Sequence, residues 1–212
     1  MSATNPKLLN LFSEELPIEF LKQIKGGFEQ IYKEAYHRGY DDPAWDAPEA
    51  NYLVPHFRRA LIEKLVRDSA NSNGLSATVM MNRKRTSEYT IISSPSSKFL
   101  FTISHCVDRS QVRHARFRQQ NSQLNSLLSQ GRFEEFDTAE ILQGNIESIY
   151  AILIHGVNFI EFAIPDTNGR KWLDCYKLDD LIDMKSIGSN AISNEDDRAF
   201  PTFKRNRKSE EG

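Results

Sequence analysis

The stretch that decides the fold is ESIYAILIHGVNFIEFAIPDTNGRKWLDCYKL, residues 147–178. Apolar side chains dominate or alternate in three successive runs, which indicates three strands. The dipeptide Asn168-Gly169 separates the last two runs, and both of its residues tolerate the positive φ angles of a two-residue turn. The stretch therefore predicts an antiparallel hairpin preceded by another strand.

Three further strands are expected upstream, where Val, Ile, Thr, Tyr and Phe alternate with polar residues. They cover residues 75–82, 88–94 and 98–106 and are separated by short polar turns, which predicts an antiparallel meander. Both groups of strands must bury an apolar face, and helical patterns precede and separate them. The fold class predicted is α+β, with an antiparallel or mixed sheet of about six strands flanked by helices.

These elements predict a single domain over residues 1–185. Its N-terminal part, residues 13–70, has apolar side chains at helical spacing, and residues 75–185 are rich in strands. Residues 186–212 turn polar and basic and are expected to form a flexible tail.

Within the helical part, a first helix is expected to begin with Ser13 as its N-cap and to end at Gly39. A kink or break is expected at Gly26-Gly27, because adjacent glycines disfavour a helix. Three prolines and several acids predict a loop over residues 40–55. A second helix is expected to follow from His56.

The composition of the chain limits the classes of protein to which it can belong. A chain of 212 residues with 39% hydrophobic content can bury a core without disulfides, and Cys106 and Cys175 lie in apolar runs typical of reduced core thiols. The sequence contains neither a membrane-spanning run nor a signal-peptide pattern. A cytoplasmic protein with no membrane contact and no cofactor is therefore expected.

Basic residues give the leading functional hypothesis. If residues 109–130 form a helix, Arg109, Arg113 and Arg116 share one face, which Gln120 continues. Arginines in a row suit backbone phosphates, and amides suit base edges. The sequence therefore predicts nucleic-acid binding through this face, although such arginines are also typical of a solvated helix surface.

Other basic clusters extend this hypothesis. Arg83, Lys84 and Arg85 occupy a turn between two expected strands, and Arg58-Arg59 follows His56. The tail carries a further cluster at residues 204–208. The net charge is only −2, so acids must be concentrated elsewhere, and a molecule with separate basic and acidic surfaces is expected.

Two alternatives remain open at this point. The acidic loop at residues 41–49, with Trp45, suits a protein-interaction module such as an inhibitor or regulatory subunit. A Pro-Asp pair ending at Asp166 and the Asp183-Met184-Lys185 run match the metal-binding frame of a Mg²⁺-dependent nuclease. Asp166 also suits a plain turn, and the second acid lies beyond the strand expected to pair with the first.

Whether the chain is an enzyme is left undecided. His105 and His155 each end an expected strand, and Cys106 adjoins the first, but no local pattern supports a Cys–His nucleophile. Neutral, hydrogen-bonded histidines are favoured instead. The sequence contains no G-x-G-x-x-G, P-loop, G-x-S-x-G or H-E-x-x-H motif, which disfavours the enzyme classes that carry them.

Overall fold

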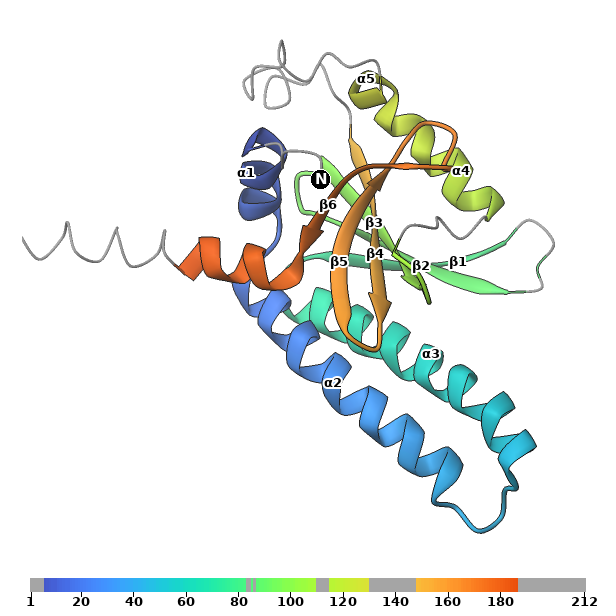
Figure 1. The fold of residues 1–212 in the computed structure, drawn as a ribbon. Helices are drawn as coiled ribbons and strands as arrows, with labels where there is room; N and C mark the ends of the chain where they lie inside the picture. The colour runs from blue at the N-terminus through green and yellow to red at the C-terminus, as the bar shows by residue number, and fades with distance from the viewer. Residues whose placement is uncertain (1–5, 83–84, 86, 110–114, 130–147, 187–212) are drawn as a thin grey trace, which may run out of the picture.

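The computed structural model describes residues 6–82, 85, 87–109, 115–129 and 148–186 (Figure 1). In chain order its elements are α1 (Pro6–Glu15), α2 (Ile18–Tyr40), α3 (Ala47–Ser72), β1 (Ser76–Met81), β2 (Glu88–Ser93), β3 (Phe99–His105), α4 (Arg116–Ser122), η1 (Gln123–Asn125), α5 (Ser126–Ser129), β4 (Ile149–Gly156), β5 (Phe159–Pro165) and β6 (Trp172–Lys177). Residues 178–186 form a further helix.

The strands form one six-stranded sheet in the order β1 to β6. Strands β3 and β4 are parallel, and all other neighbours are antiparallel. The connection from β3 to β4 must return along the sheet, since parallel neighbours cannot be joined by a hairpin, and it contains α4 and α5. The α+β class and the mixed sheet of six strands are confirmed.

Helices cover both faces of the sheet (Figure 1). On one face, Phe12 of α1 packs against Phe99 with ring centroids 4.7 Å apart, and Phe20 of α2 packs against Phe101. On the other face, the buried Asn125 side chain accepts a hydrogen bond from the Tyr150 backbone N–H and donates to the Tyr150 and Pro165 carbonyls. Successive side chains of β3 and β4 point to opposite faces of the sheet, so these two strands contribute apolar side chains to both faces.

The first two helices differ from those expected. Ser13 lies inside α1, and α2 begins after Pro17, whose extended backbone separates the two helices. Helix α2 then continues through Gly26-Gly27 to Tyr40 without a break. A Cβ on Gly27 would lie 2.5 Å from Leu65 Cδ2 of α3, so close helix packing explains why glycine is accommodated there.

Two other local expectations are also corrected. Helix α3 already begins at Ala47, because Pro48 occupies the first turn, where a missing N–H is tolerated; the loop is therefore shorter than residues 40–55. In the β5–β6 hairpin, the Gly169 N–H donates to the Asp166 carbonyl, and only Gly169 of the Asn168-Gly169 pair has a positive φ. A two-residue turn is thus not formed.

The helix expected over residues 109–130 starts later. Ala115 is extended, with φ −150° and ψ 136°, and α4 begins at Arg116. Arg109 lies between β3 and α4, outside any helix. Arg109 and Arg116 therefore do not share one helical face, because the helix does not extend back to Arg109. Residues 186–212 of the expected tail lie, apart from Ser186, outside the described residues.

Candidate functional site

A polar cleft of about 410 Å³ opens at the carboxyl ends of β3 and β4. Helix α3 and helix α4 supply its walls, and the start of β2 contributes to its rim. The cleft lies where the two helical layers meet the central parallel strand pair. Ligands commonly bind outside the carboxyl ends of parallel strands in open sheets, so this position is suited to a functional site.

Two histidines face each other at the base of the cleft. His105 and His155 are direct neighbours in the parallel register, with ring centroids 5.4 Å apart. The Tyr32 hydroxyl and His155 Nδ1 are hydrogen-bonded at 2.9 Å, and Arg58 Nη2 donates to His105 Nε2 at 3.1 Å. A guanidinium group can only donate, so His105 Nε2 is unprotonated in this arrangement.

Burial keeps both members of the Tyr32–His155 pair uncharged. It lowers the pKa of His155 to about 3, with neighbouring His105 and Arg58 acting in the same direction. Burial also raises the pKa of Tyr32 to about 12, although Arg58 opposes the shift. Tyr32 and His155 therefore form a neutral hydrogen-bonded pair at neutral pH, and the positive charge of the cluster is that of Arg58.

Arg58 is half-buried and has neutral neighbours. Its guanidinium carbon lies 4.8 Å from the centroid of the Tyr32 ring, and its hydrogen-bond partner is an imidazole. None of the ion pairs found among the described residues includes Arg58. A partly desolvated cation without a carboxylate partner favours an anionic ligand.

Two further arginines, Arg59 and Arg118, line the same cleft as Arg58. The Arg118 guanidinium donates to the Ile103 carbonyl at 3.1 Å, at the end of β3. Arg59 pairs with Glu63 at 2.9 Å and also donates to the Glu88 carbonyl. The lining of the cleft therefore contains three arginines and two acids, Glu63 and Glu88, and both acidic residues contact Arg59.

A second, more apolar cavity of about 770 Å³ lies on the other side of Arg58. Arg58 lines both spaces. The rings of Phe28, Tyr32 and Phe159 contribute to the walls of this second cavity, between α2 and the β4–β5 hairpin. Arg58 therefore stands between a polar cleft and an aromatic cavity.

The predicted site residues are only partly brought together. Arg116 and Gln120 are exposed one turn apart on α4, and the residues on either side of Arg116 line the cleft. Arg85 is exposed in the turn two residues before Ser87, another lining residue. Arg83, Lys84 and Arg113 lie outside the described residues.

Arg109 has a different environment. It forms an ion pair with the buried Glu161 at 3.3 Å and stacks over the Phe159 ring, and its carbonyl accepts a hydrogen bond from Trp172 Nε1. These contacts anchor the chain after β3 to β5 and β6. Arg109 therefore neutralises a buried carboxylate of its own chain.

The strand geometry required by the nuclease frame is not formed. Asp166 accepts hydrogen bonds from the Arg170 and Lys171 backbone N–H groups, as a turn residue does. Asp183 and Lys185 lie in the helix formed by residues 178–186 instead of on a neighbouring strand. Across the described parts of the chain, no group of three or more His, Cys, Asp or Glu side chains is arranged to hold a metal ion.

Sequence reasoning identified parts of this site separately. It noted that His105 and His155 end strands and that Arg58 belongs to a basic cluster, but it did not place Tyr32 or Arg118 in the site. Their proximity depends on the parallel pairing of β3 with β4 and on the packing of α2 and α3. No short-range pattern in the sequence reports those contacts.

Comparison with family models, curated proteins and solved structures finds no match to this chain. None of the described helices is both long and apolar enough to cross a lipid bilayer.

Proposed function

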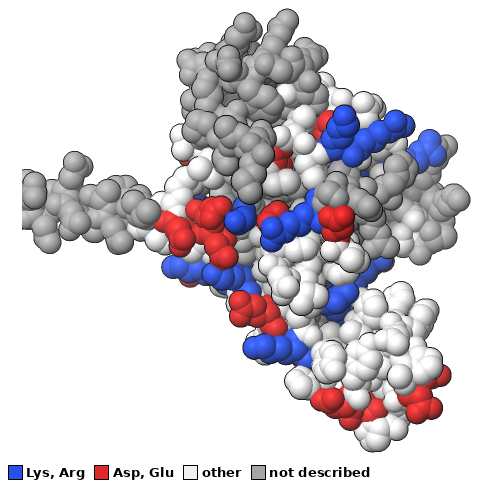
Figure 2. Space-filling view, viewed as in Figure 1, with Lys and Arg blue, Asp and Glu red and all other residues white. Residues whose placement is uncertain are grey.

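We propose that this protein binds nucleic acid, with a backbone phosphate held by Arg58 in the polar cleft. The observation that carries the proposal is the convergence of three basic segments on one cleft. Arg58-Arg59 and Arg118 line it, and Arg85 and Arg116 lie within two residues of other lining positions. Figure 2 shows Lys and Arg side chains gathered near α4.

The neutral partners of Arg58 support this assignment. An arginine already paired with a carboxylate would lose that partner on binding a phosphate, whereas Arg58 keeps its contacts with His105 and Tyr32. Arginine also presents several N–H groups in a fixed plane, which matches the oxygen atoms of a phosphate. Arg116 on the rim would contact a neighbouring phosphate of the same strand.

The adjoining aromatic cavity favours a single strand over a duplex. Unpaired bases stack on aromatic side chains in a largely sequence-independent way, and the half-buried Tyr32 and Phe159 line the cavity next to Arg58. A base in a duplex is not available for such a contact without being unstacked. We therefore expect tighter binding of single-stranded RNA or DNA than of the matching duplexes.

Fluorescence anisotropy with labelled single strands and duplexes tests the proposal. Arg58→Ala should weaken single-strand binding by about ten-fold or more, since a hydrogen bond to a charged group contributes about 1.5–3 kcal/mol. Arg116→Ala should weaken binding by a smaller factor. Arg38→Ala is the matched control, because Arg38 is exposed on α2, pairs with Glu34 and lines neither cavity.

Thermal unfolding of each variant separates binding from folding. Arg58 contacts two half-buried side chains, Tyr32 and His105, so its variant is compared only if it remains folded. The exposed Arg116 provides the second measurement. Absence of binding to every strand, or equal losses in the Arg116 and Arg38 variants, would overturn the proposal. Equal affinity for single strands and duplexes would remove the stacking role of the second cavity alone.

A further inference from the structure

Helices α2 and α3 together form an arm (Figure 1). Its end, residues 36–52, carries a cluster of exposed aromatic side chains. Tyr36, Tyr40, Trp45 and Tyr52 are 56%, 40%, 41% and 68% exposed, and no other Tyr, Trp or Phe among the described residues is classed with the exposed large hydrophobic side chains. The arm projects away from the sheet, and its end lies far from α4 (Figure 1). Concentrated exposed apolar surface of this kind marks an interaction site.

The helices that carry these aromatic residues pack closely against each other. Ala35 and Ala50 are buried between α2 and α3, and a Cβ on Gly39 would lie 2.1 Å from Val54 Cγ2, so the helices are in close contact near the arm's end. The Tyr40 hydroxyl also donates to Asn51 Oδ1 across the helix pair. The exposed rings are therefore presented in a largely preorganised arrangement, which limits the entropy lost on binding.

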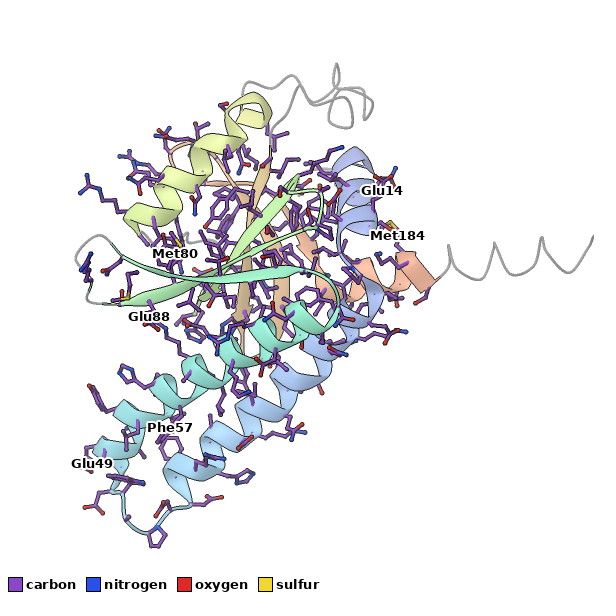
Figure 3. The ribbon with its side chains drawn as sticks, turned by 180° about the vertical axis from the view of Figure 1, so that it is seen from behind. Glu14, Glu49, Phe57, Met80, Glu88 and Met184 are labelled. Carbon is purple, nitrogen blue, oxygen red and sulfur yellow. The ribbon has the colours of Figure 1, made fainter. Side chains whose placement is uncertain are left out.

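The charge of this surface selects its partner. Residues 39–57 contain Asp41, Asp42, Asp46 and Glu49 but no Lys or Arg. Asp42, Asp46 and Glu49 take part in none of the ion pairs found among the described residues. Figure 2 shows the acidic side chains at the end of the arm, and Figure 3 places Glu49 there.

We propose that the end of the arm is a docking surface for a lysine- and arginine-rich segment of a partner protein. Ammonium and guanidinium groups bind over tyrosine and tryptophan faces, and the neighbouring carboxylates add charge-assisted hydrogen bonds. Tyrosine and tryptophan are also the residues that most often dominate binding energy at protein interfaces. Nucleic acid and anionic lipid would both be repelled by the acids, so this surface is separate in function from the cleft.

Anisotropy titrations of the full chain with a labelled peptide of alternating Lys, Arg and Gly residues test this surface, with a Glu-Gly peptide of equal length as the comparison. Trp45→Ala should weaken binding of the basic peptide by about two- to thirty-fold, the range expected for a cation–π contact. The double variant Asp46→Asn/Glu49→Gln should also weaken it. The matched control is Asp180→Asn/Asp183→Asn, which removes two exposed acids from the helix at residues 178–186.

The expected result is binding of the basic peptide that depends on Trp45 and on the acids of the arm, with nucleic-acid affinity unchanged in the same variants. Absence of peptide binding, or binding that Trp45→Ala leaves unchanged, would overturn the inference. A loss in the control variant equal to that in the arm variant would also overturn it, because the peptide would then be responding to net charge alone. Nucleic-acid binding by the cleft is measured separately, so each proposal can fail without the other.

Discussion

An arginine in this structure takes its role from the group that faces its guanidinium. Arg109 faces the buried carboxylate of Glu161, so its charge compensates a charge of the protein itself. Arg58 faces an imidazole and a phenol ring, so its charge remains available to a ligand. The sequence identified both as basic residues, but the partner that distinguishes them comes from a distant strand in each case.

Substitution of Arg109 separates these two roles. We expect Arg109→Ala to lower the free energy of unfolding by about 1–3 kcal/mol, because Glu161 would remain buried without its partner; loss of a fully buried pair would have a larger effect. Urea unfolding measures the change. Adding Glu161→Gln to the same chain should recover part of the loss, whereas single-strand affinity should stay unchanged throughout. An Arg109→Ala protein of wild-type stability would contradict the anchoring role.

His155 gives the fold a specific dependence on pH. Its pKa is about 3 in the folded protein and about 6.5 in an unfolded chain, so the unfolded state binds more protons between these values. Stability contributed by the neutral ring is present above about pH 6.5 and is lost as the pH falls toward 3. From pH 7.5 to pH 5 this loss should reach about 2 kcal/mol.

Urea unfolding at the two pH values measures the His155 effect. His155→Gln should lose about 2 kcal/mol less than the wild type over this interval. Carboxylates titrate in both proteins and therefore cancel in the comparison. Equal losses in the wild type and His155→Gln would show that the ring is not held neutral by burial.

At the level of elements, the local sequence pattern predicted the bounds of the strands more accurately than those of the helices. The upstream strands expected at residues 75–82, 88–94 and 98–106 agree with β1, β2 and β3 to within one residue at each end. Alternation with a period of two is imposed by the strand itself and is visible in a short window. The parallel pairing of β3 with β4, by contrast, joins residues far apart in the chain and has no local signal.

The helices were misjudged where tertiary packing overrides local preference. Gly26-Gly27 predicts a break by intrinsic propensity, but α2 continues through the pair while packing on α3. Arg109 is held by Glu161 and Trp172, and the extended Ala115 then delays the start of α4. These contacts lie between distant residues, so the sequence window around each helix does not contain them.

Two glycines of α2 provide a matched test of this packing. A Cβ at Gly26 would meet no atom within 4 Å, whereas at Gly39 it would meet Val54 Cγ2 at 2.1 Å. Gly26→Ala should therefore raise the free energy of unfolding by about 0.5–1 kcal/mol through helix propensity. Gly39→Ala should lower it by about 1–3 kcal/mol through overpacking against the stiff valine.

Chemical denaturation of both variants measures the two changes. A Gly39→Ala protein at least as stable as the wild type would contradict the close approach of α2 and α3 near the end of the arm. That approach also supports the exposed rings of Tyr36, Tyr40 and Tyr52, so a stabilised Gly39→Ala protein would weaken the argument for a preorganised docking surface.

For the whole molecule, the fold separates two surfaces of opposite character. The basic cleft lies at the carboxyl ends of β3 and β4. The acidic aromatic surface lies at the end of the α2–α3 arm, where Figure 2 shows the acidic side chains. Charge segregation was predicted from the sequence, because the acidic and basic runs are separate along the chain. Their positions in space were not, since the cleft assembles from α3, β2, β3 and α4.

The central claim is that the cleft binds nucleic acid through phosphate contacts, and the salt dependence of single-strand affinity tests it most directly. Each phosphate contact adds about 0.7 to the slope of log affinity against log salt for a single strand. The double variant Arg58→Ala/Arg116→Ala should therefore have a slope shallower than that of the wild type by about one unit or more, whereas Arg38→Ala should keep the wild-type slope. Parallel salt plots for the wild type and the double variant would contradict the account.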